Sequence, residues 1–597
     1  RDLRGLVRYL RLQKRMKAAR RTNLTVPGSL DLTAAKFPHK VAFYFEDQTW
    51  TFKQVQEYSL RVANVFRGKV KKGDAVALLM ENRVEYMAIW LGLARLGAVP
   101  ALLNYQLRLT SLSHCITSAS CTLIICAVEL QQVLHDISCD ISALPIYVSG
   151  AGKGDDSKII TTTAGGSAHN LDTLLSSSPA IHVPEEQDVK FTDKLIYIYT
   201  SGTTGMPKAA VITHSRYMFA CIGMLYMVGL THRDVLYQPL PLYHTSGGNI
   251  GVGMALCDGV TIVLRKKFSV TNYFPDCQRY GCTAGQYIGE ICRYLLNTPE
   301  RDVDKKHKLD VLFGNGLRPQ IWKQFQDRFN IPRITEFYGS TEGNANIINM
   351  DGRVGAVGFV SVLMPFVYPC TLVRVDADTG NPLRNSKGIC IRCGPGEPGE
   401  FVGKIIANDP VRDFKGYADK KATNKKIIHD VWKKGDSAFR SGDLLVMDEE
   451  GYMFFKDRTG DTFRWKGENV STGEVESHLS GLVKSTDVCV YGVEVPHTEG
   501  RAGMAAVLDP EGSLDVNEIA TGVITLLPVY ARPLFLRTVK HMEITGTYKL
   551  RKMDLQKEGY DIKAIKDPVY ILDSKSRTYN LLKSDVYDRL MDGSLRL

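Results

Sequence analysis

The stretch Leu195–Lys208, which reads LIYIYTSGTTGMPK, constrains the fold and the chemistry of this chain more than any other. Its first half, Leu195–Tyr199, is β-branched and aromatic, which predicts a buried strand. The glycines of Thr200–Gly205 let the backbone come close to a ligand, and the hydroxyls beside them can donate hydrogen bonds to phosphate oxygens. Backbone N–H groups around such a loop bind anions, and Lys208 adds a positive charge. The stretch therefore predicts a loop that binds a triphosphate.

The spacing within this loop excludes the Walker A loop. The GxxxxGK[ST] pattern is absent, and no helical pattern follows Lys208 at once. A plain surface turn rich in Gly, Ser and Thr is the alternative interpretation. The length of the run and the lysine at its end favour a phosphate loop.

Length and composition limit the class of protein. At 597 residues the chain is too long for a single hydrophobic core, so we expect a large domain and one or more smaller ones. A net charge of +11 favours anionic ligands or an anionic membrane surface, and without a nucleic-acid-binding motif we expect no nucleic acid partner. Thirteen scattered cysteines favour a reducing compartment. No apolar run reaches the roughly 18 residues of a membrane-spanning helix.

The first 21 residues form a basic pattern with a helical period, RDLRGLVRYLRLQKRMKAARR. Its apolar residues stand among seven arginines and two lysines and are Leu3, Leu6, Val7, Leu10 and Leu12. A helix of this kind can lie on an anionic membrane surface. The alternative is a solvated helix packed on the main domain, and the sequence does not decide between the two.

Strand patterns such as Ala75–Met80 alternate with helical patterns such as Arg83–Leu96, which predicts a parallel or mixed sheet with helices on both faces. The polar segment Ser157–Ser178 predicts an exposed loop. After Asp457–Asp461 the chain changes to short strands and helices. We therefore expect an α/β protein in three parts: a basic helix at residues 1–21, a large domain at 22–457 and a small, mobile α+β lid domain at 458–597.

The loop Thr200–Lys208 resembles the phosphate loop of the adenylate-forming superfamily, which includes acyl-CoA synthetases, luciferases and peptide-synthetase adenylation domains. Other stretches match this superfamily in the same order: Gly314–Leu317, Tyr338–Glu342, Ser441–Asp443, Asp457–Ser471 and Glu543–Lys552. The resemblance implies a large N-terminal adenylate-forming domain with mixed sheets and helices. It also implies that the ATP-binding residues are Tyr199, Thr200, Ser201, Gly202, Thr203, Thr204, Gly205, Lys208, Gly314, Asn315, Gly316, Tyr338, Gly339, Thr341, Asp443 and Arg458.

The pentapeptide Tyr338–Glu342, YGSTE, resembles the YGxTE motif of the superfamily. An aromatic ring there can stack on adenine, Thr341 can bond a phosphate, and Glu342 offers a hard oxygen ligand for Mg²⁺. By the same resemblance, Asp443 accepts hydrogen bonds from the ribose hydroxyls and Arg458 contacts ribose or phosphate. Each motif alone could be an ordinary turn or strand end. Because the motifs follow one another in the same order as in the superfamily, we favour a role in ligand binding over ordinary turns or strand ends.

The stretch Glu543–Lys552, EITGTYKLRK, resembles the terminal lysine motif, with Lys549 in the catalytic position. Tyr548 stands where the superfamily commonly has Gly. In the hinge motif, Gly460 aligns with the pivot, which is usually Asp or Lys, so the pivot residue stays open. The resemblance implies that coenzyme A lies beside Lys466, Gly467 and Glu468, where glycine lets the pantetheine tail pass close to the backbone.

His244, in the sequence LPLYH, matches the residue that borders the acyl pocket in this superfamily. The alternative is a structural histidine with satisfied hydrogen bonds. Tyr287 and Gly289 are expected in another wall of the same pocket. The residues expected to take part in catalysis are Lys549, Glu342, Thr203 and His244, with Glu342 as the metal ligand.

Four stretches narrow the resemblance further: Tyr287–Leu295, Asp457–Ser471, Tyr491–Val493 and Glu499–Ala505. Together they resemble the fatty acid transport proteins, which are also very-long-chain acyl-CoA synthetases. This resemblance implies ATP, Mg²⁺ and coenzyme A, a long-chain fatty acid substrate, and a membrane surface or an upstream membrane anchor. The catalytic domains would face the cytosol at the endoplasmic reticulum, the plasma membrane or the peroxisome, and a homodimer is compatible with the resemblance.

The first hypothesis is therefore a long-chain or very-long-chain fatty acyl-CoA synthetase whose reaction is coupled to fatty acid uptake. A bile-acid CoA ligase of the same family is an alternative. Another is a fatty acid transporter with a weak or vestigial ligase site, which the intact set of expected ATP ligands disfavours. A peptide-synthetase module is disfavoured because no carrier segment is recognisable after Lys549.

Overall fold

The computed structural model describes residues 1–160, 168–202, 205–376, 380–407, 409–458, 462–483, 487–542, 552–573 and 575–595. Backbone contacts divide the chain into two compact units. The first comprises Arg1–Tyr105, Cys115–Tyr199 and Ala209–Thr459, and the second comprises Gln106–His114, Thr200–Lys208 and Gly460–Leu597. Four residues expected at the site or hinge lie outside the described residues: Thr203, Thr204, Gly460 and Lys549.

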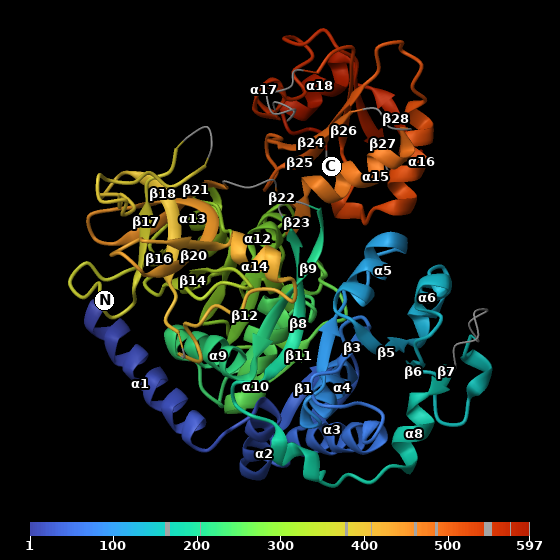
Figure 1. Ribbon diagram of the computed structural model, residues 1–597, viewed down its shortest axis with the longest axis vertical. Coiled ribbons are helices and arrows are strands. Elements are labelled where there is room, and N and C mark those ends of the chain that lie inside the picture. Colours follow the sequence, from blue (N-terminus) through green and yellow to red (C-terminus); the bar gives the residue numbers. More distant parts are fainter. Residues whose placement is uncertain are drawn as a thin grey trace. The chain divides into compact units, whose positions relative to one another are not determined.

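A seven-stranded sheet contains the strand that precedes the phosphate loop (Figure 1). Its order is β7-β6-β5-β3-β4-β8-β9, and every pair from β7 to β8 is parallel. The central strands are almost entirely buried Ala, Val, Leu, Ile and Cys, which is typical of a parallel sheet covered on both faces. The bounds are β3 Ala75–Leu79, β4 Val99–Leu102, β5 Cys121–Ala127, β6 Ile146–Ser149, β7 Ala168–Asn170, β8 Lys194–Gly202 and β9 Gly205–Thr213.

The prediction of an exposed loop over Ser157–Ser178 is wrong in its second half. Strand β7 pairs there with β6, and helix α8, Leu171–Ser177, follows it. Asn170 caps this helix by accepting a hydrogen bond from the backbone N–H of Thr173 at 3.1 Å. Only two apolar residues of the helix are buried, so its periodic pattern was too short to recognise.

An eight-stranded sheet in the first unit brings together the ends of three strands that precede expected site residues (Figure 1). Its order is β15-β14-β13-β12-β10-β11-β1-β2, with antiparallel pairs only at its two ends. The carboxyl ends of parallel strands meet at one edge, where α/β proteins bind ligands. The bounds are β1 Val41–Phe45, β2 Gln48–Thr51, β10 Val235–Gln238, β11 Thr261–Leu264, β12 Ala284–Ile288, β13 Val311–Asn315, β14 Arg333–Tyr338 and β15 Ile347–Asn349.

Helices of the first unit cover these sheets with apolar faces. Buried Trp322 and Phe325 of α13, for example, belong to one core cluster with Tyr273 and Phe274 of α11. The bounds are α1 Asp2–Arg21, α2 Val26–Lys36, α3 Phe52–Phe66, α4 Val84–Arg95, α6 Gln131–His135, α7 Ser138–Ile141, α9 His214–Val228, α10 Val252–Asp258, α11 Tyr273–Arg279, α12 Gly289–Leu296, α13 Pro319–Phe329 and α14 Lys420–Lys425. Helix α5, Leu109–Ser118, contains residues of both units.

Helix α1 packs along α9, and its buried residues are Leu12, Met16 and Ala19 (Figure 1). Arg15 donates a hydrogen bond to the carboxylate of Asp258 at 2.5 Å and another to the hydroxyl of Tyr226 at 3.2 Å. One face of this basic helix is therefore attached to the main body, while its other face is exposed. None of the described helices is both long and apolar enough to span a bilayer.

A third, antiparallel sheet of the first unit contributes Asp443. Its order is β16-β21-β20-β18-β17, and β19 pairs with β20. Strand β20 places Asp443 opposite Arg458 of β21. The bounds are β16 Ala356–Phe359, β17 Cys370–Val373, β18 Pro398–Lys404, β19 Ile427–His429, β20 Ser437–Met447 and β21 Tyr452–Arg458.

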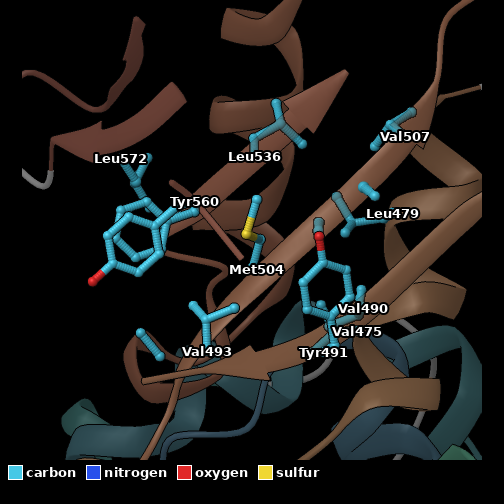
Figure 2. Packing of buried hydrophobic residues seen from close by; sticks show 14 of the residues in the cluster. Val475, Leu479, Val490, Tyr491, Val493, Met504, Val507, Leu536, Tyr560 and Leu572 are labelled. Atoms are coloured by element: carbon cyan, nitrogen blue, oxygen red, sulfur yellow. The ribbon is translucent and has the colours of Figure 1, made fainter. Parts of the chain in front are cut away.

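The second unit has its own core between a five-stranded sheet, β24-β25-β26-β27-β28, and its helices. Figure 2 shows Met504 of β25, the strand between β24 and β26, among Val490, Val493, Leu536 and Tyr560. A separate pair of strands, β22-β23, forms a hairpin. The bounds are β22 Thr462–Trp465, β23 Glu468–Ser471, α15 Thr472–Leu482, β24 Val488–Val493, β25 Ala502–Leu508, α16 Val516–Leu526, β26 Phe535–Val539, α17 Lys552–Glu558, β27 Val569–Asp573, β28 Thr578–Leu581 and α18 Ser584–Met591.

Candidate functional site

The end of β13 and the residue after it, Gly314–Gly316, contain the expected adenine wall. Gly314 lies opposite Tyr287 of β12, and a Cβ atom at Gly314 would collide with the Tyr287 carbonyl and come within 2.8 Å of its ring. Gly316 has φ +84°, a conformation that side chains rarely adopt. Glycine at both positions therefore lets this segment lie directly beside the expected acyl wall.

Glu336, on β14, is a buried carboxylate that the sequence analysis missed. Its side chain accepts hydrogen bonds from the backbone N–H of Gly316 at 3.0 Å, from that of Leu317 at 2.9 Å and from the hydroxyl of Tyr287 at 2.7 Å. The residue is only 1 % exposed. A buried charge needs such donors, so this one carboxylate fixes the backbone directly after β13 and the side chain on β12 together. The available signal was an acidic residue inside the strand RITEFY.

Tyr338 and Asp443, both expected at the nucleotide, are in direct contact. The Tyr338 hydroxyl donates a hydrogen bond to Asp443 Oδ2 at 2.6 Å. The two residues lie on two different sheets of the first unit, Tyr338 on β14 and Asp443 on β20. Gly339 follows Tyr338, and a Cβ atom there would collide with the side-chain oxygen of Asn346. The structure thus joins the end of β14 to the middle of β20.

An irregularity in the pairing of β18 with β20 lies next to Asp443, and an ion pair supports it. Glu400, fully buried, binds Arg440 at 2.6 Å and also accepts a hydrogen bond from the backbone N–H of Gly442 at 3.1 Å. Gly442 has φ +82°. Arg458 is opposite Asp443 in the strand register, and its side chain lies outside the described part of the chain.

Arg216, on α9, holds the loop that contains Thr341 and Glu342. One guanidinium nitrogen donates to the carbonyls of Thr341 at 3.2 Å, Glu342 at 2.9 Å and Gly343 at 2.5 Å. Burial lowers the pKa of Arg216 to about 10, and Glu342 and Asp413 oppose this shift, so the side chain is charged at neutral pH. Sequence reasoning missed this residue because it lies far from the loop in the chain.

Glu342 is a buried carboxylate with one oxygen, Oε1, that accepts a hydrogen bond from the Tyr417 hydroxyl at 2.9 Å. The Thr341 hydroxyl lies 2.9 Å from the Thr245 hydroxyl, one residue after His244. A carboxylate held in this way is a suitable hard-oxygen ligand for Mg²⁺. These residues therefore fit the expected ion.

Another trio of potential metal ligands in the described residues is Asp31, His182 and Glu186. Arg95, whose side chain is buried, binds Asp31 at 2.6 Å and Glu186 at 3.1 Å. Because this cation already satisfies both carboxylates, the trio is a structural ion-pair cluster.

The segment after His244 lies against the expected acyl wall. The His244 ring is 4.5 Å from the Tyr243 ring, and residues Thr245–Gly251 form a π-helix. A Cβ atom at Gly251 would lie 2.6 Å from Oε1 of Gln286, which is on β12 beside Tyr287. Gly289 begins helix α12 directly after that strand.

Two buried polar atoms near this segment have no hydrogen-bond partner among the described residues, Oε1 of Gln286 and Oδ1 of Asn249. The Gln286 amide nitrogen donates to the carbonyl of Ser246 at 3.0 Å. Buried polar atoms are normally paired, so these two oxygens are available to a bound ligand or water.

The phosphate loop joins β8 and β9, and Ser201, Gly202 and Gly205 belong to the ends of these strands. The Tyr199 hydroxyl donates to the carbonyl of Cys115 at 2.5 Å, and burial raises the pKa of this tyrosine well above its ordinary value. The hydroxyl oxygen of Thr200 is buried without a hydrogen-bond partner in the described part of the chain. An unpaired hydroxyl at this position fits a loop that binds an anion. Lys208 lies within β9.

Lys466 and Gly467, expected at coenzyme A, form the two-residue tip of the β22-β23 hairpin in the second unit. Their φ values are +51° and +84°, as in the favoured hairpin turns with two positive φ angles. Trp465 and Glu468 pair across the hairpin on either side of the tip. The three expected residues are therefore adjacent at the tip of one hairpin.

Comparison with known proteins places residues 30–404 in the family of AMP-binding enzymes. Long-chain fatty acid transport protein 1 of Mus musculus is 45% identical over 600 residues, which covers 100% of this chain and 92% of the relative. The human protein of the same name is 45% identical over 603 residues, with the same coverage. Long-chain fatty acid transport protein 6 of Mus musculus is 39% identical, covering 99% of this chain and 94% of the relative.

Solved structures of CoA synthetases share the fold. The o-succinylbenzoate CoA synthetase of Bacillus subtilis has a TM-score of 0.70 at 21% identity and covers 89% of this chain and 98% of its own. The fatty acyl CoA synthetase of Mycobacterium tuberculosis has a TM-score of 0.58 at 22% identity and covers 91% and 99%. These similarities confirm the predicted adenylate-forming α/β fold.

Proposed function

Because the chain belongs to the family of AMP-binding enzymes that includes the long-chain fatty acid transport proteins, we propose that it is an ATP-dependent ligase that joins long-chain or very-long-chain fatty acids to coenzyme A. The fatty acid carboxylate attacks the α-phosphorus of ATP, which gives an acyl-adenylate and pyrophosphate. The thiol of coenzyme A then attacks the acyl carbon and AMP leaves. Conversion to the CoA ester traps the acid and drives its uptake.

One observation in particular supports this proposal. The hydrogen bond between Tyr338 and Asp443 joins the residue expected at adenine to the residue expected at ribose. Strand β14, which ends at Tyr338, pairs with β13, which contains Gly314 of the expected adenine wall. A nucleoside needs an apolar wall for its base and acceptors for its ribose hydroxyls, and these residues supply both.

Charge accumulates on the phosphate oxygens during the first step. In the proposed mechanism Lys208, Lys549 and the hydroxyls of Thr200 and Thr203 stabilise that charge better in the transition state than in the ground state. Mg²⁺ held by Glu342 would neutralise part of the same charge. Thr341 orients a phosphate oxygen, and His244 borders the entrance for the acyl chain.

The second step requires a different arrangement of the small domain. We propose that rotation near Gly460 removes Lys549 and brings the hairpin tip Lys466–Glu468 to the pantetheine tail. The boundaries 22–457 and 458–597 are proposed for the two domains that move.

The reaction is tested by incubating purified protein with ATP, Mg²⁺ and acids from medium to very long chain, with and without coenzyme A. AMP and acyl-CoA, followed by mass spectrometry, should appear together and most strongly with long chains. A bile acid in the panel tests the related bile-acid CoA ligase. Folded protein that forms no AMP with any acid would contradict the ligase and favour a transporter with a vestigial site.

We also propose that the protein contacts an anionic bilayer through its N-terminal patch, defined as Leu3, Val7 and Leu10 of α1 with Val362, Leu363 and Phe366 of the neighbouring loop. Leu3, Leu363 and Phe366 are 72%, 74% and 79% exposed. Large apolar side chains gathered at a surface favour an interaction site.

The loop with Val362–Phe366 is attached to the first half of α1. Ser361 donates a hydrogen bond to the carboxylate of Asp2, and Arg412 donates to both the Tyr9 hydroxyl at 2.6 Å and the Val367 carbonyl at 3.1 Å. The two groups of apolar side chains therefore belong to one surface.

Charge supports a bilayer as the occupant of this surface. Exposed cations follow the patch along α1, and none has an ion-pair partner among the described residues: Arg11, Lys14, Lys17, Arg20 and Arg21. Apolar side chains flanked by cations complement acyl chains and anionic headgroups. We also propose that the catalytic domains face the cytosol at the endoplasmic reticulum, the plasma membrane or the peroxisome. A homodimer stays a prediction.

A further inference from the structure

The carboxylate of Glu336 contacts two walls that the proposed reaction uses for different substrates. We infer that Glu336 is a positioning residue that couples the adenine wall, Gly314–Leu317, to the acyl wall at Tyr287, so that binding of ATP and binding of the fatty acid strengthen each other. This inference rests on the proposed function.

The sharing of one oxygen atom is the basis of the coupling. Glu336 Oε1 accepts hydrogen bonds from both the Tyr287 hydroxyl at 2.7 Å and the Leu317 N–H at 2.9 Å. The other oxygen accepts from the Gly316 N–H at 3.0 Å. In a buried site, donors to a shared carboxylate influence one another strongly, because each compensates part of the same charge.

The packing gives the coupling a second route. The Tyr287 ring lies over Gly314, since a Cβ atom at that glycine would be 2.8 Å from the ring. Tyr287 and Gly314 are also opposite each other in the parallel pairing of β12 and β13. A shift of the tyrosine therefore displaces the backbone that is expected to cover adenine.

A purely structural role for Glu336 gives a different kinetic result. Loss of a structural support lowers stability and the amount of active protein, and it leaves the two KM values independent of each other. Coupling makes the KM for ATP depend on the concentration of fatty acid, and a defect at the acyl wall must change that dependence. Nucleotide kinetics can therefore separate the two roles.

The decisive variant is Tyr287→Phe, which removes one hydroxyl from the acyl wall. Pyrophosphate release without coenzyme A is measured at low and at saturating fatty acid. In the wild type the KM for ATP should fall as fatty acid is added. In Tyr287→Phe this fall should disappear, and the KM for ATP at saturating fatty acid should rise about tenfold through loss of a hydrogen bond to a charged group.

Tyr273→Phe is the matched control. Tyr273 is also buried, and its hydroxyl donates to the carbonyl of Gln286 on the same strand at 3.1 Å. The variant Tyr273→Phe also removes one buried hydroxyl and its hydrogen bond, but that bond is not made to Glu336, so the variant should keep the wild-type dependence on fatty acid. Thermal unfolding of both variants verifies that each is folded.

Glu336→Gln, which keeps the shape and removes the charge, should raise the KM for ATP and the KM for fatty acid together. The inference is overturned if Tyr287→Phe changes only the KM for fatty acid, or if it behaves as Tyr273→Phe does. Failure of the proposed function is distinguishable, because the wild type would then release no pyrophosphate. Calorimetric titration of ATP with and without fatty acid still tests the coupling in that case, since equal ATP affinities in the two titrations would contradict it.

Discussion

Three buried charged residues, Arg216, Glu336 and Glu400, shape the candidate site without being expected to touch the reacting atoms. Arg216 holds three successive carbonyls of the Thr341–Gly343 loop, Glu336 holds the backbone directly after β13, and Glu400 holds Gly442, the residue before Asp443 in β20. Each is an ion or hydrogen-bond centre inside the protein, where an unpaired partner is costly. The candidate site therefore depends on these three supporting residues as much as on the residues that are expected to contact the ligands.

Removal of the Tyr338 hydroxyl should weaken nucleotide binding. Tyr338→Phe leaves Asp443 without a 2.6 Å hydrogen bond, and loss of one bond to a charged group corresponds to about a tenfold rise in the KM for ATP. The KM for ATP is obtained from the rate of pyrophosphate release at varied ATP concentrations. Tyr280→Phe is the control, because its hydroxyl donates to the Glu46 carbonyl away from these residues. An unchanged KM in Tyr338→Phe would remove Asp443 from the proposed ribose site.

His214 should make the protein sensitive to acid. Burial lowers the pKa of its imidazole from 6.5 to about 3, with Asp193 opposing the shift and Lys72 adding to it, while Nδ1 accepts the Val26 N–H at 3.1 Å. The unfolded chain therefore takes up the proton first, and stability is lost as the pH falls from 6.5 toward 3. At about pH 5.5 the loss from this residue is about 1.4 kcal/mol.

The check is urea unfolding at about pH 7.5 and about pH 5.5. His214→Gln keeps an acceptor for Val26 and should lose about 1.4 kcal/mol less than the wild type on acidification. His39→Gln, at an exposed position, should follow the wild type. Equal losses in the wild type and His214→Gln would refute the assignment.

At the scale of elements, the π-helix Thr245–Gly251 fits its neighbours only because its glycines have no side chains. A Cβ atom at Gly248 would collide with the carbonyl of Leu242. Gly248→Ala should therefore lower the free energy of unfolding by about 1–3 kcal/mol. Gly481→Ala is the control, since Gly481 lies within α15 with open space around it and should be neutral or slightly stabilising. Equal unfolding midpoints for the two variants in urea would contradict the close fit.

The hairpin tip should matter to the second step alone. Gly467→Ala places a side chain at φ +84°, where strain of about 1–3 kcal/mol displaces the turn. Acyl-CoA formation should fall, while pyrophosphate release without coenzyme A should be unchanged. Equal losses in both assays would show that the hairpin is not specific to coenzyme A.

Local patterns predicted the regular elements well. The strand expected at Ala75–Met80 is β3, Ala75–Leu79, and the helix expected at Arg83–Leu96 is α4, Val84–Arg95. Motifs also selected Tyr338 and Asp443, which the structure brings into contact. Arg216 was not predictable, because its function arises from contact with residues more than a hundred positions away. Glu336 had only a weak signal, since one acidic residue in a strand does not reveal its partners.

At the scale of the whole molecule, the N-terminal patch should bind vesicles that contain anionic lipid. The double variant Leu363→Ser/Phe366→Ser should lose most co-sedimentation, because both side chains are about three-quarters exposed and would insert among acyl chains. Binding should also weaken at high salt, because salt screens the cations of α1.

The double variant Val529→Ser/Leu581→Ser is the matched control, since it removes two exposed apolar side chains from the second unit. Its co-sedimentation should equal that of the wild type. Equal binding to vesicles of neutral lipid alone, or equal loss in the two double variants, would contradict an anionic bilayer as the occupant of the patch.

Helix α9 contacts both α1 and the loop that contains Glu342. Arg8 and Arg15 of α1 bind the Met227 carbonyl and the Tyr226 hydroxyl at one end of α9, and Arg216 near the other end holds the loop. The part of α9 between Arg216 and Met227 is roughly 16 Å long, at a rise of about 1.5 Å per residue. If α1 lies on a lipid layer as proposed, a displacement of α1 would act through α9 on the backbone that presents Glu342.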